Sequence, residues 1–151
     1  MKAKDIEEIY DLRRVLEGLA AEKAALLMQE KDLKKYGQIA EMMAEYETAS
    51  RNELDLFLKA DLKLHSLILS TADNQRLIKI LTNLFDFINS FRIFDAQQGK
   101  QRIVQAHDEH KKILKALVKK DAGLARSLLE QHIENAKRNI LADFMPGKVN
   151  P

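Results

Sequence analysis

The sequence lacks cysteine altogether and has only two prolines and five glycines in 151 residues. Without thiols there is no disulfide and no thiolate metal site, which leaves histidine and carboxylate side chains as the strong metal ligands. Both prolines, Pro146 and Pro151, lie in the last six residues. Residues that break helices are therefore scarce over most of the chain, and long helices are favoured.

An excess of charge of one sign and long apolar runs are also missing. The formal net charge is +2 with 32% charged residues, a mixed pattern that gives no electrostatic argument for nucleic-acid binding. No apolar run approaches the roughly 20 residues that a membrane span needs. No hydrophobic segment follows the basic start Met1–Lys4, so no secretion signal is predicted. We therefore expect a soluble, cytoplasmic protein without a membrane partner.

Apolar residues recur three or four positions apart along nearly the whole chain, which is typical of amphipathic helices. Alternating runs of Val, Ile and Thr are absent, so no strand is predicted. Asp32 and Asp121 stand where N-caps are expected. The fourth helix has the broadest apolar stripe, which predicts a central position for it. The predicted helices cover about residues 5–29, 32–50, 52–73, 74–95, 100–120 and 121–144.

Short connections between about six such helices predict an all-α fold, an antiparallel bundle in which successive helices are neighbours. A chain of this length buries roughly 70% of its unfolded surface, which is enough for a full core. We therefore predict a single domain over residues 1–145. Residues 146–151 are expected to form a flexible tail.

Four titratable side chains lie on apolar helix stripes. Asp61 and His65 are one turn apart on the third predicted helix, His110 lies on the fifth and His132 on the sixth. A single inward histidine is more often a hydrogen-bonded core residue than a ligand, an inward Asp61 can instead pair with a core cation, and His107 competes with His110 for the same face. Together, however, one carboxylate and three imidazoles suit a divalent ion such as zinc or nickel.

Arg13 is a further polar residue on an apolar stripe, that of the first helix. An inward guanidinium needs an anionic partner, and its fork fits a carboxylate. That partner is either internal, Asp61 or Glu17, or the carboxylate of an acidic ligand. The sequence also leaves two coordination geometries possible. The four protein ligands either complete a tetrahedron or occupy part of an octahedron and leave positions for water or a carboxylate.

Four segments stand out by their order and spacing: Glu8–Glu17 followed by Ala20-Ala21, Asp61–His65 followed by Asn74–Leu77, Glu109–Leu117 followed by Asp121 and Ala125, and Gln131-His132. Together they resemble the FCD domain, the C-terminal effector-binding domain of FadR-type regulators in the GntR superfamily. The resemblance extends from about Asp5 to Phe144. It implies an all-helical antiparallel bundle with a metal in a central pocket.

The resemblance also implies which side chains hold a divalent metal, zinc or nickel. It favours His110 over His107, because the family's histidine directly follows an acid, as His110 follows Glu109. A count of six helices is closer to the VanR-like subgroup than to FadR itself, which has an extra helix. The implied metal ligands are Asp61, His65, His110 and His132.

The function that the resemblance implies is metal-dependent sensing of a small organic acid by a transcriptional regulator. Arg13 would help to hold the effector carboxylate over the metal, and Asn74, Arg102 and His107 are further candidates for the cavity lining. Effector binding to a homodimer would reorient its DNA-binding domains. No strand pair and no basic recognition helix for a winged helix-turn-helix are recognised in these residues, so DNA contact is expected only through such a domain outside this sequence.

Two alternatives from other classes use the same residues. A mononuclear metallohydrolase needs a general base beside the metal, and Glu109 is adjacent to His110 in sequence, but neighbouring helix positions point about 100° apart. No other acid stands out on the inward faces, so no enzyme is expected. In the second alternative the polar core residues are purely structural parts of a helical bundle, which then binds neither metal nor acid.

Overall fold

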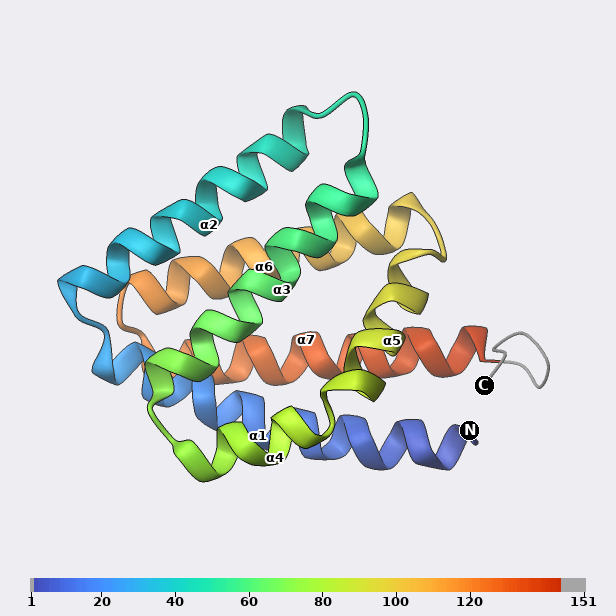
Figure 1. Ribbon diagram of the computed structural model, residues 1–151, viewed down its shortest axis with the longest axis horizontal. Helices are drawn as coiled ribbons and strands as arrows, with labels where there is room; N and C mark the ends of the chain where they lie inside the picture. Colours follow the sequence, from blue (N-terminus) through green and yellow to red (C-terminus); the bar gives the residue numbers. More distant parts are fainter. Residues whose placement is uncertain (1, 145–151) are drawn as a thin grey trace.

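A computed structural model gives the architecture of residues 2–144. This part of the chain has seven helices and no strand (Figure 1), which confirms the predicted all-α bundle. The predicted tail, residues 146–151, lies outside the described residues. The helices are α1 (Ala3–Leu27), α2 (Glu30–Thr48), α3 (Glu53–Ala72), α4 (Gln75–Asn83), α5 (Phe85–Ala96), α6 (Lys100–Val118) and α7 (Ala122–Asp143).

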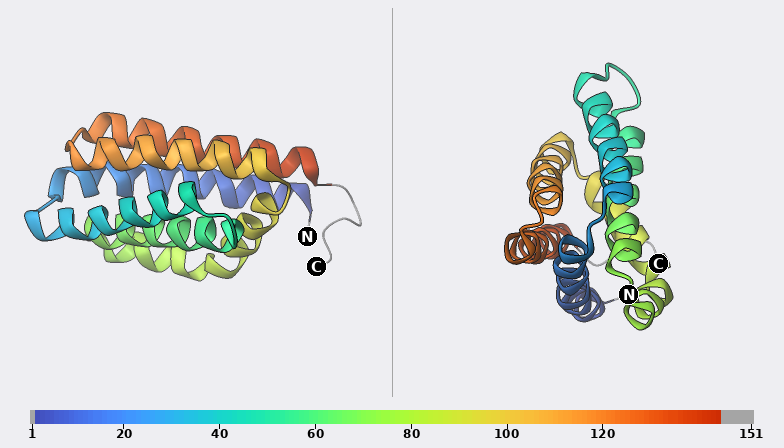
Figure 2. Two further views of the ribbon diagram at one scale, coloured as in Figure 1. Left: turned by 90° about the horizontal axis from the view of Figure 1, so that it is seen from above. Right: turned by 90° about the vertical axis from the view of Figure 1, so that its left-hand side faces the viewer.

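The long helices pack against one another in antiparallel pairs. The first and last helices, α1 and α7, lie side by side, and α3 packs between α1 and α2 (Figures 1 and 2). The inner face of the second half of α1 consists of small residues, of which Ala20, Ala21 and Ala24 are fully buried. Small contact residues let helix axes approach closely. Gly18 extends this face, because a Cβ there would lie 2.7 Å from Cγ of Glu130 on α7.

The fourth predicted helix is in fact two helices, α4 and α5, which meet at Leu84. Neither proline nor glycine marks the break. The hydroxyl of Thr82 donates a hydrogen bond to the carbonyl of Ile78 at 2.7 Å, a contact that tends to bend helices. Threonine and asparagine at positions 82 and 83 are also poor helix formers. The turn at Leu84 gives α5 a direction of its own.

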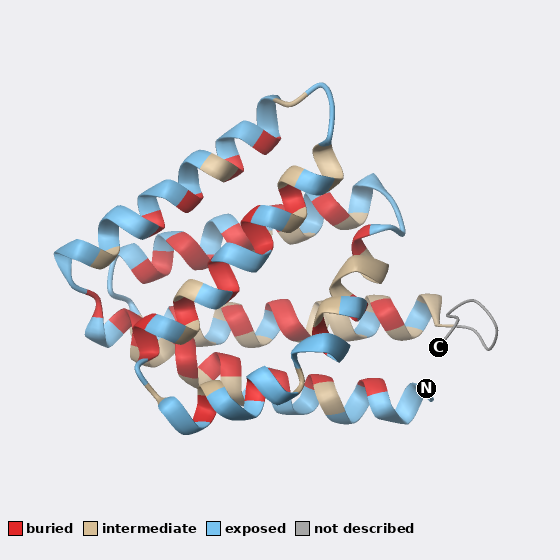
Figure 3. Cartoon of the chain, viewed as in Figure 1, coloured by how far each residue is buried: buried red, intermediate tan, exposed pale blue. Residues whose placement is uncertain are grey.

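The predicted central position of this segment was wrong. Its apolar stripe is broad because α4 and α5 each bury a separate, narrower face, and the remaining apolar side chains stay at the surface (Figure 3). Three of them are 47%, 41% and 47% exposed, namely Ile80, Phe85 and Phe87. The centre of the bundle is formed instead by α1, α3, α6 and α7.

Most helix ends lie within two or three residues of the predicted ones. Asp121 is the N-cap of α7, as predicted, and its carboxylate accepts a backbone N–H of the first turn at 3.2 Å. Asp32, by contrast, is not the cap of α2. That helix begins at Glu30, and the Asp32 carboxylate accepts the backbone N–H of Gln29 at 3.0 Å from inside the first turn. Gly99, with φ of 134°, makes the turn into α6 in a region that glycine adopts easily.

The apolar core gives way to polar side chains in the middle of the bundle. Arg13 on α1, Asp61 on α3 and His110 on α6 are 2%, 5% and 1% exposed, respectively. Buried charges of this kind need partners, and the contacts below supply them. None of the described helices combines the length and the apolar character that crossing a bilayer requires.

Candidate metal centre

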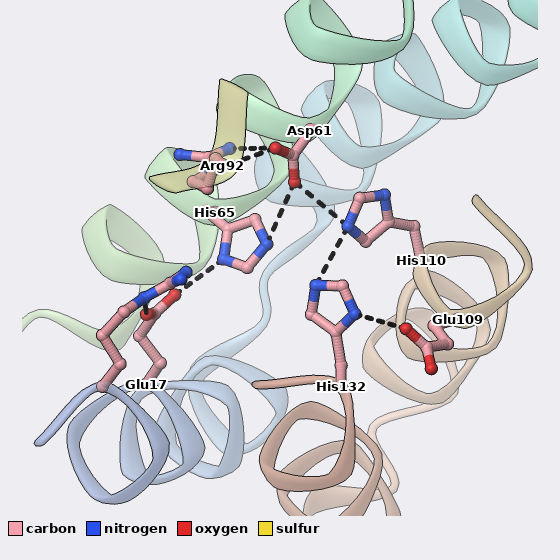
Figure 4. Close-up of polar contacts among 8 residues, drawn as sticks. Glu17, Asp61, His65, Arg92, Glu109, His110 and His132 are labelled. Atoms are coloured by element: carbon pink, nitrogen blue, oxygen red, sulfur yellow. Dashed lines mark hydrogen bonds and ion pairs between the residues drawn. The ribbon is translucent and has the colours of Figure 1, made fainter. Parts of the chain in front are cut away.

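The four side chains predicted as metal ligands come together in the bundle. Helix α3 supplies Asp61 and His65, one turn apart, and α6 and α7 supply His110 and His132 (Figure 4). All four are buried, and one potential ligand atom of each lies within 4.8 Å of the others. The predicted inward orientation of all four is therefore confirmed, and metal binding by them stays a prediction.

The facing atoms are three imidazole nitrogens and one carboxylate oxygen. Asp61 Oδ1 lies 3.3 Å from His65 Nε2 and 3.1 Å from His110 Nε2. His110 Nε2 in turn lies 3.2 Å from His132 Nε2. Three rings thus direct the same nitrogen, Nε2, at one point between three helices (Figure 4).

Two of these rings, those of His65 and His132, are each held by a carboxylate on the side away from the centre. Glu17 Oε1, on α1, lies 2.6 Å from His65 Nδ1, and Glu109 Oε1 lies 2.8 Å from His132 Nδ1. An ionised carboxylate can only accept, so each ring donates Nδ1–H outward. The Nε2 atom then faces the centre with its lone pair, which is the arrangement of histidines that ligate metals.

Two arginines neutralise Glu17 and Asp61. Arg13 Nε donates to Glu17 Oε2 at 2.6 Å, so the internal partner of Arg13 is Glu17. Arg92 Nε, from α5, donates to Asp61 Oδ2 at 2.8 Å. Burial alone would raise the pKa of Asp61, but Arg92 and the two facing imidazoles hold it well below its ordinary value. Asp61 is therefore a carboxylate whose second oxygen, Oδ1, is directed at the histidines.

The three histidines differ in their affinity for protons. Burial lowers the pKa of His110 to about 4 and also lowers the pKa of His132, so both rings are neutral. Burial acts in the same direction on His65, but the carboxylates of Glu17 and Asp61 on its two sides outweigh it and raise the pKa. A proton on His65, or a metal ion at the centre, would place a further positive charge between these two carboxylates.

A cavity of about 30 Å³ adjoins the four side chains. One water needs roughly 10–15 Å³, so the space admits water or one small polar group as it stands. Arg13 and Arg102, both predicted to contact an effector, line this cavity. Arg102 comes from α6, and its Nη2 donates to Asp143 Oδ2 at 2.9 Å.

The structure does not bring the other two predicted effector residues to the cavity. Asn74 is the N-cap of α4, and its side chain accepts the backbone N–H of Leu77 at 3.1 Å. His107 lies on the α2 side of α6, with Nε2 2.7 Å from Glu47 Oε1 and its ring centroid 4.6 Å from that of Tyr46. The contacts of Asn74 with Leu77 and of His107 with Glu47 and Tyr46 thus give both residues a structural role.

Sequence reasoning missed several residues of the site. Tyr10, Arg92 and Asp95 line the cavity, and Glu109 contacts His132 on the neighbouring helix instead of the centre. A signal for two of them was available, because Arg92 and Asp95 are three residues apart and interrupt an apolar segment. Arg92 and Asp95 reach the cavity because of the direction of α5, and no residue pattern predicts that direction.

The fold and this cluster define a class: an all-helical domain with a buried site of one carboxylate, three imidazoles and an adjoining cavity. The family model of the FCD domain matches residues 8–135. The chain belongs to the FCD domain family.

Curated relatives of the chain are transcriptional regulators by name. The HTH-type transcriptional regulator YdhC of Bacillus subtilis is 28% identical over 99% of this chain and 66% of its own length. The Uxu operon regulator of Haemophilus influenzae is 32% identical over 86% of this chain and 49% of its own length. The chain thus spans between half and two thirds of these relatives.

Solved structures share the fold. The metal-free FCD domain of TM0439 superimposes with a TM-score of 0.73 at 23% identity, over 94% of this chain and 95% of that one. The Zn2+-bound form of the same domain gives a TM-score of 0.72 at 22% identity, over 95% and 96%. At this level of identity the likeness establishes the architecture.

Proposed function

We propose that this chain is the metal-dependent sensing domain of a transcriptional regulator and that it binds a small organic acid. One divalent ion would be held by the four buried side chains at the centre of the bundle, Asp61, His65, His110 and His132. The observation that carries the proposal is their convergence, with potential ligand atoms within 4.8 Å of one another. The names of the relatives, which are transcriptional regulators, support the regulatory role.

The chemistry of the convergent atoms supports a cation. Glu17 and Glu109 fix protons on the outer nitrogens of two rings, so lone pairs meet Asp61 Oδ1 at the centre. A neutral His110 can donate Nε2–H to only one of its two neighbours, Asp61 Oδ1 at 3.1 Å or His132 Nε2 at 3.2 Å. His65 Nε2 faces Asp61 Oδ1 as a further acceptor at 3.3 Å. A proton on His65 relieves that last contact, whereas a divalent ion relieves all of them. The carboxylates behind the rings also raise the basicity of the ligands.

The type of ligand indicates the metal. Neutral imidazoles with one carboxylate suit zinc and nickel, whereas magnesium and calcium prefer oxygen ligands throughout. The Zn2+-bound FCD domain of similar architecture favours zinc. When bound, such an ion supplies a Lewis acid to which a carboxylate of the effector can coordinate.

Arginines beside the centre support an acidic effector. Arg13 and Arg102 line the cavity, and guanidinium forks bind carboxylates with two parallel hydrogen bonds. Arg13 belongs to α1 and Arg102 to α6, so a ligand held by both would change how these helices lie relative to each other. A ligand shifts such an equilibrium only by its differential affinity for the two arrangements, typically about 1–3 kcal/mol.

We further propose a homodimer and no sequence-specific DNA contact by these residues alone. Leu12 and Val15, one turn apart on α1, are 48% and 53% exposed, and further exposed apolar side chains lie on α4 and α5. Paired copies would cover such side chains. Native mass spectrometry should give twice the mass of one chain. A monomer at micromolar concentration, or retention of one DNA sequence against competitor at physiological salt, would contradict this part of the proposal.

The metal is tested by elemental analysis of protein purified without an affinity tag. We expect about one zinc or nickel ion per chain, and loss of the ion in Asp61→Ala and His132→Ala. His107→Ala is the matched control, because His107 is also a buried histidine with a carboxylate partner but lies outside the cluster. Retention of the ion in both cluster variants would refute the ligand set, and no metal in the wild type after reconstitution would refute the proposed function.

A further inference from the structure

Three buried polar atoms have no hydrogen-bond partner among the described residues: the hydroxyl of Tyr10, Nη2 of Arg92 and Oδ1 of Asp95. Tyr10 is 1% exposed. Arg92 Nη2 lies 2.6 Å from Asp61 as an ion pair but without the alignment of a hydrogen bond. Buried polar groups are nearly always hydrogen-bonded, and each one without a partner is costly. All three residues line the cavity beside the four histidine and aspartate ligands.

Asp95 is the acceptor in this group. The nearest cation is Arg102, whose Nε lies 3.8 Å from Asp95 Oδ1, beyond hydrogen-bond distance. Arg102 instead donates through Nη2 to Asp143 at 2.9 Å. Burial raises the pKa of Asp95 to about 6, since the attraction of Arg102 does not compensate for lost hydration. The cavity wall therefore contains a carboxylate oxygen that lacks a donor.

The charges around the cavity give a ligand its orientation. The guanidinium groups of Arg13 and Arg102, together with Arg92 and the proposed ion, attract a carboxylate. Asp95 repels one, so a ligand with a carboxylate at that position would be disfavoured. A hydroxyl or an ammonium group at that position would instead give Asp95 the donor that it lacks.

We propose that Asp95 selects, among small acids, those that carry a hydrogen-bond donor in addition to their carboxylate. The donor, a hydroxyl or an ammonium group, contacts Asp95 Oδ1, and the hydroxyl of Tyr10 makes a second contact with the ligand. The selection concerns the same site and rests on the proposed function. A plain acid of equal length offers Asp95 no donor, and sites built to hydrogen-bond a ligand group discriminate strongly against analogues that lack it.

The test is calorimetric titration of the zinc-loaded protein with acids of matched carbon skeleton. The first series is propionate, lactate and alanine, and the second is succinate, malate and aspartate. Within at least one series we expect the hydroxy or amino acid to bind at least about tenfold more tightly than the plain acid, as a hydrogen bond to a charged group provides. Equal affinity of plain and donor-bearing acids would overturn the inference and leave the proposed function intact.

Variants assign the preference to Asp95. Asp95→Leu should bring the donor-bearing acid to within about threefold of the plain acid. Asp95→Asn keeps an acceptor without the charge, so it should retain a preference for a hydroxyl and lose one for an ammonium group, which distinguishes the two donors. Asp86→Asn, an exposed position on the same helix, is the control and should bind like the wild type. An undiminished preference in Asp95→Leu would refute the role of Asp95.

Failure of this inference is distinguishable from failure of the proposed function. If no acid of either series binds the zinc-loaded protein, acid sensing as proposed here is refuted, and the selection by Asp95 is refuted with it. Circular dichroism and the melting temperature of each variant show whether it is folded, so that loss of preference in a folded Asp95 variant reports on the contact itself.

Discussion

At the scale of single residues, the centre depends on carboxylates that do not face it. Glu17 and Glu109 each accept a hydrogen bond from the outer nitrogen, Nδ1, of a histidine. They decide which nitrogen of the ring carries the lone pair and in which direction the ring points. Without these two contacts, the tautomers of His65 and His132 would not be fixed, and their Nε2 lone pairs would not be directed at the centre.

Glu109→Gln should therefore weaken metal binding without removing a ligand. The expected loss is about 10- to 100-fold in affinity, because the amide is a weaker acceptor for His132 Nδ1–H than the carboxylate. Competition with a fluorescent zinc chelator measures the change. Glu47→Gln is the matched control, since Glu47 contacts His107 in the same manner at 2.7 Å outside the cluster. Equal affinities in the two variants would contradict the role of Glu109.

Asp95 should make the stability of the protein depend on pH. Its folded-state pKa of about 6 lies above the ordinary value of 3.8, so the folded state holds the proton more tightly than the unfolded state. The resulting penalty is absent at low pH, grows as the pH rises from about 4 to about 6, and is complete above that.

Asp95→Leu removes this penalty. Its gain in unfolding free energy over the wild type should be larger at pH 7.5 than at pH 5 by on the order of 1 kcal/mol. Urea unfolding with a chelator present measures both values. A gain in unfolding free energy that is the same at both pH values would show that Asp95 does not cause a pH-dependent loss of stability.

At the scale of helices, the sequence predicted the elements well and their directions less well. The apolar period located the long helices, and polar residues on apolar stripes identified Arg13, Asp61, His65, His110 and His132, because burying such groups is costly enough to need a reason. The break at Leu84 has no proline or glycine signal. The direction of α5 was therefore not predictable, and neither were the contacts of Arg92 and Asp95 with the cavity.

Glu109 illustrates a second limit of prediction. Its position beside His110 on one helix separates the two side chains by about 100°, which sequence reasoning used correctly. The contact with His132 crosses to α7, and only the packing of α6 on α7 decides it. The apolar period describes one helix at a time. It therefore cannot predict a contact such as that of Glu109 with His132, which lies on another helix.

Asn74 offers a prediction at the level of a helix end. Its side chain caps α4 by accepting the Leu77 N–H at 3.1 Å. Asn74→Ala should lower the unfolding free energy by about 1 kcal/mol and leave zinc and acid affinity unchanged, and Asn74→Ser should recover most of the stability. Urea unfolding and calorimetry measure the two effects. A loss of acid affinity with unchanged stability would favour the contact with the effector that the family resemblance implied.

At the scale of the whole molecule, the centre joins three helices and is bounded by two more. Asp61, His110 and His132 come from α3, α6 and α7, while Glu17 and Arg92 reach in from α1 and α5. A metal bound there would add coordination bonds between α3, α6 and α7, which already meet through the contacts of Asp61, His110 and His132. The residues proposed to bind the ion therefore also connect these helices.

Metal loading should consequently stabilise the entire bundle. An ion at 1,000 times its dissociation constant contributes about 4 kcal/mol, and a domain of this size gains roughly 2–4 °C per kcal/mol. We expect zinc to raise the melting temperature by about 10 °C. The shift should be absent in Asp61→Asn, and differential scanning calorimetry with and without zinc measures it. An equal shift in that variant would mean that zinc binds elsewhere.

The most direct test of the central claim is anomalous diffraction at the zinc edge from crystals of the zinc-loaded chain. We predict one anomalous peak per chain, about 2.0–2.2 Å from Asp61 Oδ1 and from the Nε2 atoms of His65, His110 and His132. The absence of a peak among these four atoms, or a peak bound only by surface side chains, would contradict the account.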